Sequence, residues 1–518
     1  MVAQQAQAGG AESAPLWVNR IRTLEPKASG RPARELLQEW KVHPHLIELL
    51  ERHNISQLLP VQEKVIPMLI DGDALDRFSA AASDLVITAP TGQGKTLCYL
   101  LPIVNSIVKN NRTGLAALIL APTRELVKQI YDFCAWFVDE DPATYDLRGG
   151  ELLLVHSCHG NTSFIEDHTF LLDKRPQIVV FTPGRFVEHF AHREASHEKA
   201  LDFASLKWMV IDEVDLLLSQ SFYNWTAAVA AICRQCEGHD EAAARHTFAP
   251  HRPQKILVSA TIPSKSAEID LLQLKRPLLL RGADSLYSLP ENLSQRFITT
   301  TRNRKAFVLV TLVRYLLRNA APGDKTIVFC SYKNTAHSTA RMLELFSLYT
   351  QSRLQILELS ARLSQKQREE ALQRFQGADT MCLVCSDVGS RGMNFANTRS
   401  IINYDFPKSI TTYIHRIGRT ARATEAGTSY IIVSGQNEAR FGQFTAELNL
   451  HADDVQQLDP SELVDEGQEE GFKEAFEHVK KMVERCLELE NEGSVMHDAP
   501  LPSNWMTLLQ PRAAEEAS

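Results

Sequence analysis

Short apolar runs alternate with longer segments of helical periodicity along the first half of the chain. Runs of four or five residues between polar turns are typical of buried strands, and the longer segments predict helices. This alternation predicts a parallel sheet covered by helices, because parallel strands need crossover connections. The predicted strands are Leu85–Thr88, Ala117–Ala121, Leu152–His156, Ile178–Thr182, Trp208–Ile211 and Ile256–Ser259.

The apolar rhythm lapses around residues 281–293 and then resumes. Glycine, proline and asparagine cluster in this gap, which predicts a linker at residues 284–296. Because 518 residues exceed what one core supports, we expect two α/β domains, at residues 34–283 and 297–450. The predicted strands of the second domain are Thr326–Cys330, Leu354–Leu359, Met381–Cys385, Ser400–Asn403 and Ser429–Val433.

The two ends of the chain have different compositions. Residues 1–33 are rich in Ala, Gln, Gly and Ser, which predicts a disordered tail. Residues 451–518 hold 17 acidic and 5 basic side chains, a net charge of −12. Because the whole chain has a net charge of −8, residues 1–450 carry a net charge of +4. An acidic linker is expected first, followed by a helical extension in which apolar residues recur from Phe472 to Leu487. That helix should pack on the second domain or on a partner.

Membrane and secretory classes do not fit the sequence. No apolar run reaches membrane-spanning length, and the N-terminus lacks a basic start followed by an apolar stretch. The first arginine is Arg20, and Glu12 precedes it, which argues against a mitochondrial presequence. We therefore expect an intracellular protein without a membrane partner.

Nine cysteines are scattered along the chain, and two pairs have CxxC spacing. Cys233 with Cys236, and Cys382 with Cys385, raise the alternative of a zinc site. The second pair lies in an apolar run, where strand geometry points its two members to opposite faces. No histidine cluster at ligand spacing joins them, so reduced thiols are the better interpretation.

A glycine-rich turn follows the first predicted strand. Its two glycines allow backbone N–H groups to face phosphates, Lys95 adds a charge for the outer phosphates, and Thr96 offers a hydroxyl to Mg²⁺. An ordinary strand–turn–helix connection is the alternative, and Ala89 stands where the general phosphate-loop pattern has glycine. The predicted nucleotide contacts are Ala89, Pro90, Thr91, Gly92, Gln93, Gly94, Lys95 and Thr96.

Three carboxylates follow the predicted strand Trp208–Ile211. Ligands of open α/β sheets bind at the carboxyl ends of the strands, so these side chains should reach the nucleotide. Asp212 is placed to hold Mg²⁺ directly or through water, and Glu213 to deprotonate the attacking water. Asp215 is expected to anchor neighbouring polar groups. A solvated acidic turn is the alternative.

Taken in series, these motifs resemble those of the DEAD-box RNA helicases. The series comprises Ala89–Thr96, Asp212–Asp215, Ser259–Thr261 and His415–Arg422, and the resemblance covers roughly residues 35–450. The resemblance implies two tandem RecA-like P-loop NTPase domains, each a parallel sheet flanked by helices, that use ATP and Mg²⁺. Val214 replaces the alanine of the family name and leaves all three carboxylates in place.

The resemblance also implies roles for single residues. Gln62 corresponds to the glutamine that reads adenine, which suits a side-chain amide that both donates and accepts. Asn394 stands where the family has an aspartate near the ribose, and Ala421 where it usually has glycine. Arg419 and Arg422 are the arginines that reach the γ-phosphate from the second domain.

Two further sets follow from the same resemblance. The implied RNA contacts are Thr123, Arg124, Gly160, Thr182, Gly184, Arg185, Arg368, Ser386 and Arg391. Hydroxyls, glycine N–H groups and guanidinium groups bind phosphate without reading bases, so little sequence preference is expected. The implied coupling residues between the domains are Asp215, Ser259, Thr261, His415 and Arg416, with Arg416 holding Asp215.

Because the nucleotide site is split between two domains, we expect ATP and RNA to favour the same closed state and so to bind cooperatively. The expected activity is ATP-dependent local unwinding of RNA or remodelling of RNA–protein complexes. An RNA clamp that uses ATP only to close is the alternative. A small-molecule kinase fits poorly, because it has no need of a second domain with a His-Arg-x-x-Arg-x-x-Arg segment.

The short strings Pro60–Gln62 and Ser360–Arg362 resemble the ribosome-assembly branch of the family. That resemblance implies the nucleus or nucleolus, with the cytoplasm and the mitochondrion as alternatives. We expect a monomer that acts on RNA and responds to a protein activator.

Overall fold

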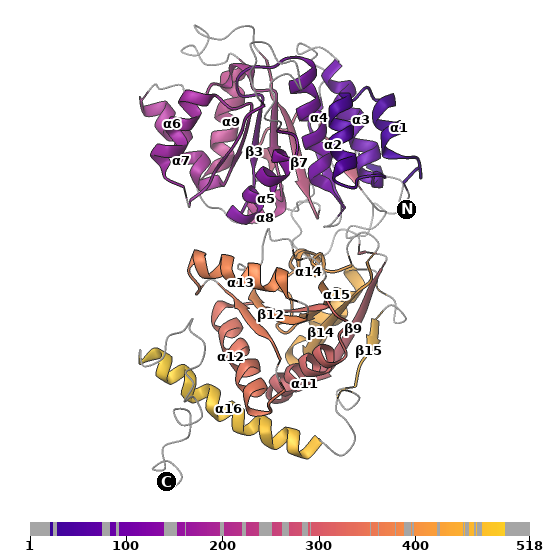
Figure 1. Ribbon diagram of the computed structural model, residues 1–518, viewed down its shortest axis with the longest axis vertical. Coiled ribbons are helices and arrows are strands. Elements are labelled where there is room, and N and C mark those ends of the chain that lie inside the picture. The colour runs from indigo at the N-terminus through magenta and orange to yellow at the C-terminus, as the bar shows by residue number, and fades with distance from the viewer. Residues whose placement is uncertain are drawn as a thin grey trace. The chain divides into compact units, whose positions relative to one another are not determined.

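The computed structural model divides into two compact units, Met1–Ser288 and Leu289–Ser518, each with its own sheet (Figure 1). The boundary falls inside the segment predicted as a linker. The structure describes residues 21–23, 28–74, 83–89, 93–138, 153–160, 162–196, 201–219, 224–237, 251–261, 269–281, 289–290, 292–352, 354–360, 362–378, 380–387, 395, 398–421, 425–448, 450, 455–459, 463 and 469–492.

The first unit contains an eight-stranded sheet whose described strand pairs are all parallel. Its order is β1-β8-β2-β7-β6-β3-β5-β4, so β2 and β6 lie on either side of β7. The strands are β1 (Ile21–Thr23), β2 (Leu85–Thr88), β3 (Ala117–Leu120), β4 (Val155–Cys158), β5 (Ile178–Phe181), β6 (Trp208–Ile211), β7 (Gln254–Ser259) and β8 (Leu278–Arg281).

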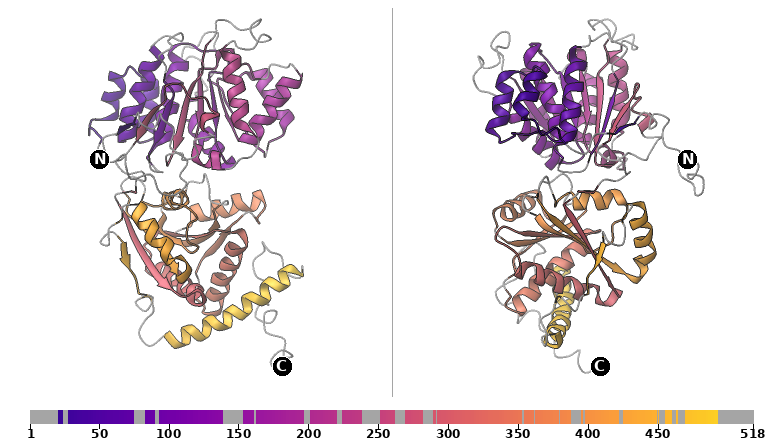
Figure 2. Two further views of the ribbon diagram at one scale, coloured as in Figure 1. Left: turned by 180° about the vertical axis from the view of Figure 1, so that it is seen from behind. Right: turned by 90° about the vertical axis from the view of Figure 1, so that its right-hand side faces the viewer.

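Helices cover both faces of this sheet (Figure 2). Successive residues of a strand point to opposite faces, so Trp208 and Val210 join one apolar cluster while Met209 and Ile211 join another. Both faces are thus buried, which explains the uninterrupted apolar runs. The helices are α1 (Ala33–Glu39), α2 (Pro44–Arg52), α3 (Pro60–Ala74), α4 (Lys95–Lys109), α5 (Arg124–Ala135), α6 (Phe164–Lys174), α7 (Pro183–Ser196), α8 (Val214–Ser219) and α9 (Trp225–Cys236).

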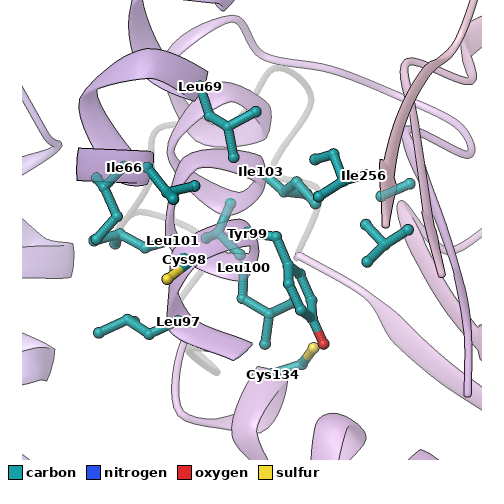
Figure 3. Packing of buried hydrophobic residues seen from close by; sticks show 14 of the residues in the cluster. Ile66, Leu69, Leu97, Cys98, Tyr99, Leu100, Leu101, Ile103, Cys134 and Ile256 are labelled. Atoms are coloured by element: carbon teal, nitrogen blue, oxygen red, sulfur yellow. The ribbon is translucent and has the colours of Figure 1, made fainter. Parts of the chain in front are cut away.

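Helix α4 is buried along nearly its whole length. Figure 3 shows its side chains packed among Ile66 and Leu69 of α3 and Ile256 of β7. A helix that is apolar all round belongs inside a protein, and its rigid N-terminus can then fix the turn that precedes it. The phosphate-loop residues are therefore anchored by the core of the first unit.

The second unit contains a seven-stranded sheet, again with parallel pairs throughout the described strands. Its order is β11-β12-β10-β13-β14-β9-β15. The strands are β9 (Leu293–Thr300), β10 (Lys325–Cys330), β11 (Ile356–Leu359), β12 (Met381–Ser386), β13 (Thr398–Asn403), β14 (Gly427–Ser434) and β15 (Val455–Gln457).

Helices also cover both faces of the second sheet (Figures 1 and 2). The apolar side of α16 shares one cluster with α11 and α12, which confirms the predicted packing of the C-terminal helix on the second domain. The opposite cluster contains Phe375 of α13. The helices are α11 (Lys305–Arg318), α12 (Lys333–Tyr349), α13 (Gln365–Gly377), α14 (Ile410–Ile417), α15 (Glu438–Glu447) and α16 (Glu469–Asn491).

Four strands correct the sequence-based outline. β1 lies in the tail predicted to be disordered, β9 begins inside the predicted linker, β15 lies in the predicted acidic linker, and β8 was not expected. β1 and β15 are three residues long and pair at sheet edges, so their sequences carry little apolar signal. Polar residues interrupt β9, and only Gln295 and Ile298 among its residues are buried.

All nine cysteines are buried. Cys382 and Cys385 lie in different apolar clusters, on opposite faces of the second sheet, as strand alternation predicts. Among the described residues, no helix is both long and apolar enough to span a bilayer.

Candidate nucleotide and RNA sites

The predicted phosphate turn lies between β2 and α4. Gly94 has a φ of 62°, a left-handed conformation that glycine adopts without strain, and it caps the N-terminus of α4. Lys95 is buried and its Nζ donates to the carbonyl oxygen of Ala89 at 2.8 Å. Gln93 and Thr96 are half-buried beside it. Pro90, Thr91 and Gly92 lie outside the described residues.

Gln62 lies against this turn. Its Oε1 accepts from the backbone N–H of Leu59 at 2.9 Å, and its Nε2 donates to the carbonyl oxygen of Gly94 at 3.0 Å. A Cβ on Gly94 would come within 2.3 Å of that Nε2. The Gln62 amide therefore fixes the turn, a role that the expected contact with adenine did not anticipate.

Asp212 lies at the carboxyl end of β6 and is almost fully buried. Its Oδ2 accepts from the Tyr99 hydroxyl at 2.9 Å, and its Oδ1 accepts from the backbone N–H of Glu213 at 2.9 Å. Burial and the nearby Glu213 charge raise the pKa of Asp212 to about 6. A cation bound here would offset the cost of burying the ionised carboxylate, because it favours the charged form of Asp212.

Tyr99 is a site residue that the sequence analysis missed. It extends from α4 within the apolar cluster (Figure 3), and burial raises the pKa of its hydroxyl. Its bond to Asp212 ties α4 to β6. The available signal was a tyrosine four residues after Lys95 on an otherwise apolar helix, which hides a polar group that needs a partner.

Glu213 lies in the turn between β6 and α8, and Asp215 lies in the first turn of α8. Glu213 has a φ of 50°, a strained conformation for a residue with a Cβ, and such strain is often found at functional sites. Asp215 Oδ2 accepts from the Thr261 hydroxyl at 2.6 Å, and the Thr261 N–H donates to Ser259 Oγ at 3.2 Å. The predicted coupling residues of the first unit are thus joined into one chain of hydrogen bonds after β6 and β7.

Thr123, Arg124 and Gly160 lie on the first unit beyond the ends of β3 and β4. Thr123 caps α5, with its hydroxyl accepting from Leu126 N–H at 3.2 Å. Arg124 is exposed, and its guanidinium lies over Gly160, where a Cβ would come within 2.6 Å of it. Arg124 and Gly160 thus share one exposed surface, where phosphate oxygens can be bound.

Thr182 and Gly184 lie at the start of α7, where backbone N–H groups attract anions. Arg185, which was predicted to contact RNA, is largely buried. Its side chain is 9% exposed, lies 3.6 Å from Asp167, and donates to Glu188 at 2.9 Å and to the carbonyl oxygen of Thr162. Arg185 therefore stabilises the turn between β4 and α6.

In the second unit, Arg416, which was predicted to couple the domains, is buried in a network of hydrogen bonds. Its guanidinium is 2% exposed and makes a bidentate pair with Asp387, at 2.7 and 2.9 Å. Its Nη1 donates to Asn403 Oδ1 at 3.1 Å and to the carbonyl oxygen of Asp405 at 2.7 Å. These bonds join α14 to β12 and β13, so Arg416 is held by four hydrogen bonds within its own unit.

The other predicted residues of the second unit fall into three groups. His415 and Ser386 are buried, at α14 and at the end of β12. Arg419 is half-buried in the turn after α14, and Arg368 lies in the first turn of α13. Arg391, Asn394 and Arg422 lie outside the described residues.

The fold and these sites define a two-domain P-loop nucleoside triphosphatase. Residues 59–269 match the DEAD/DEAH box helicase family model, and residues 304–424 match the helicase conserved C-terminal domain. The chain belongs to the DEAD-box ATP-dependent RNA helicases.

Curated relatives span most of the chain. The chain is 27% identical to DEAD-box ATP-dependent RNA helicase 1 of Arabidopsis thaliana, over 91% of this chain and 92% of the relative. It is 28% identical to ATP-dependent RNA helicase DBP6 of Saccharomyces cerevisiae, over 90% and 74%.

Solved structures share the fold. A structure of Mss116p bound to ssRNA and AMP-PNP matches with a TM-score of 0.70 and 22% identity, over 92% of this chain and 89% of the other. S. cerevisiae Dbp5 bound to RNA and ADP BeF3 matches with a TM-score of 0.60 and 17% identity, over 86% and 98%. The predicted tandem RecA-like fold is therefore confirmed.

Proposed function

We propose that this helicase hydrolyses ATP at the carboxyl ends of β2 and β6. Lys95 is at the N-terminus of α4, where its charge and the helix dipole favour phosphates. Glu213 follows Asp212 directly and acts as the base that orients and deprotonates the attacking water. The observation that carries this proposal is the bond from Tyr99 to Asp212, which fixes the acidic turn relative to the phosphate turn.

The residues present fit a magnesium ion. Thr96 and Asp212 supply oxygen donors, which Mg²⁺ prefers, and Asp212 is oriented by two hydrogen bonds. When bound, Mg²⁺ neutralises charge on the phosphates. Thr96 and Asp212 would hold it, partly through water.

RNA is the proposed partner of the surface formed by Thr123, Arg124 and Gly160, with Thr182 and Gly184 at the α7 N-terminus. Backbone contacts of this kind predict little sequence preference. In the second unit, Arg368 and Ser386, with Arg391, are the proposed RNA contacts. We further propose that Arg419 and Arg422 serve the γ-phosphate and that Asn394 is a contact for the ribose.

We also infer that the protein acts as a monomer in ribosome assembly in the nucleolus, and that a protein activator stimulates it. The strings Pro60–Gln62 and Ser360–Arg362 support this assignment. Sequencing RNA that is crosslinked to the protein in cells tests the pathway.

The change Glu213→Gln tests the hydrolysis mechanism. We expect ATP affinity to stay within about twofold, while RNA-stimulated phosphate release falls at least about 100-fold, because general-base catalysis contributes roughly 10²–10⁴. The variant should also stay on RNA in the presence of ATP. Glu166→Gln, an exposed change on α6, is the control and should behave as the unmodified protein. Normal turnover of Glu213→Gln would overturn the assignment of the base.

The same assay separates a helicase from a clamp. Phosphate release that RNA accelerates, together with separation of a short duplex, supports the helicase mechanism. ATP-dependent RNA binding without stimulated phosphate release would favour the clamp.

A further inference from the structure

A row of polar side chains runs through the second unit from α16 to the loop at residues 360–364. His337 of α12 occupies its centre, with Nε2 at 2.6 Å from Glu490 Oε2 and Nδ1 at 2.7 Å from Glu358 Oε2. Ser360 Oγ then donates to Glu358 Oε1 and accepts from the backbone N–H of Arg362 at 3.2 Å. Two helices and one strand that are distant in sequence, α12, α16 and β11, are thus connected through one buried histidine.

The row is charged and buried. His337 and Ser360 are at most 1% exposed, and Glu490 is 2% exposed. Burial disfavours the imidazolium, but hydrogen bonds to Glu358 and Glu490 outweigh it and raise the pKa of His337 to about 9. Arg341 Nε also donates to Glu490 Oε1, at 2.8 Å. Both oxygens of Glu490 therefore accept from cationic donors.

Docking of α16 does not by itself require this arrangement. Its other end is held by aromatic contacts, with Phe472 4.9 Å from Phe346 and Phe476 5.4 Å from Phe307 between ring centroids. Glu490 lies about 21 Å further along the helix, at 1.5 Å per residue. Burying charged groups costs free energy that apolar residues in their place would avoid. We therefore expect the row to have a role besides packing α16 onto the second unit.

The loop at residues 360–364 leads directly into α13. Ser364 caps this helix in a reciprocal pair with Gln367, and the Arg368 N–H donates to the Ser364 carbonyl oxygen at 3.0 Å. Ser360 fixes the first bend of the loop, because its hydroxyl and its carbonyl oxygen accept from Arg362 and Leu363. The position of the Arg368 side chain thus depends on a loop whose first residue, Ser360, is hydrogen-bonded to Glu358.

We propose that Glu490 and His337 are positioning residues for RNA binding: through Glu358 they fix Ser360 and the described residues 362–364 before α13, and so aim Arg368 at the RNA backbone. The inference rests on the proposed function of Arg368 as an RNA contact. It makes α16 part of the RNA-binding apparatus, acting through His337 and Glu358.

Glu490→Gln tests the inference in the full-length protein, with Glu484→Gln, an exposed change on the same helix, as the matched control. The amide keeps the size of the side chain but removes the charge that holds His337. We expect the RNA concentration for half-maximal ATPase activity to rise about fivefold to tenfold. The turnover number at saturating RNA and the KM for ATP should stay within twofold, a split that general destabilisation would not produce. Glu484→Gln should leave all three values unchanged.

Ser360→Ala provides a second route, because it removes the last link of the row without touching α16. We expect a similar rise in the half-saturating RNA concentration with an unchanged melting temperature. The double variant with Glu490→Gln should show less than the product of the two single effects, since both interrupt one row. Half-saturation within twofold of the unmodified protein in both single variants would overturn the inference.

Arg368→Ala separates this inference from the function on which it rests. If Arg368→Ala weakens RNA binding while Glu490→Gln and Ser360→Ala do not, the positioning role is wrong. If Arg368→Ala itself leaves RNA binding unchanged, the proposed RNA contact is wrong, and the positioning role falls with it.

Discussion

At the scale of single residues, burial decides what each arginine of the His415–Arg422 segment can do. Arg416 is 2% exposed and gives four hydrogen bonds to Asp387, Asn403 and Asp405 within its own unit. Arg419, three residues later, is half-buried in the turn after α14. Equal spacing in the sequence thus places Arg416 in the core and Arg419 in a partly exposed turn.

Arg416→Lys measures the structural role. A lysine ammonium cannot make the bidentate pair with Asp387 and also reach Asn403 and Asp405. We expect the free energy of unfolding of the second unit to fall by about 1–3 kcal/mol, because lysine keeps the charge beside Asp387 but leaves buried acceptors without a donor. Urea unfolding of the full-length chain provides the measurement.

Arg374→Lys is the control, since Arg374 is exposed on α13 and should change stability by less than about 0.5 kcal/mol. Equal stability of the two variants would show that the buried pair contributes nothing.

At the scale of elements, the turn before α4 depends on one glycine and one glutamine. Gly94 is left-handed, and a Cβ there would come within 2.3 Å of Gln62 Nε2. We expect Gly94→Ala to raise the KM for ATP at least about tenfold, because strain of 1–2 kcal/mol adds to the displacement of Gln62.

Gly323→Ala separates the effect of backbone strain from the effect of a steric clash with Gln62. Gly323 also has a positive φ, of 92°, but a Cβ there would meet nothing within 4 Å. This variant should lose some stability and keep its KM for ATP. A steady-state titration of ATP at saturating RNA measures the KM of each variant. Equal KM values for the two variants would contradict the role given to Gln62.

The strands buried on both faces were predictable, since their apolar runs reflect two covering layers of helices. β2 and β6 match the predicted bounds, whereas β4 begins three residues later than expected. The short edge strands β1 and β15 depend on neighbours distant in sequence, so no local pattern identifies them.

The site was predictable where its chemistry is local and not where it depends on tertiary contacts. The phosphate turn and Asp212 follow directly from strand ends. The bonds of Tyr99 to Asp212 and of Asp387 to Arg416 join residues 113 and 29 positions apart, so only the folded chain shows them.

At the scale of the whole molecule, the chain consists of two parallel-sheet units, and the acidic C-terminal region is part of the second one. β15 pairs with β9, and α16 contributes Phe472, Phe476 and Val479 to the core. The net charge of −12 in residues 451–518 is therefore attached to structural elements that cannot be removed without exposing that core.

The central claim is that the two units share one ATP, with Lys95, Asp212 and Glu213 on the first and Arg419 on the second. The most direct test is the rate of a single turnover of ATP hydrolysis at saturating RNA in Arg419→Ala. We expect that rate to fall about 10³-fold, as when an arginine that stabilises the transferring phosphoryl group is lost, with ATP affinity of the RNA-free protein unchanged. A rate within twofold of the unmodified protein would contradict the account.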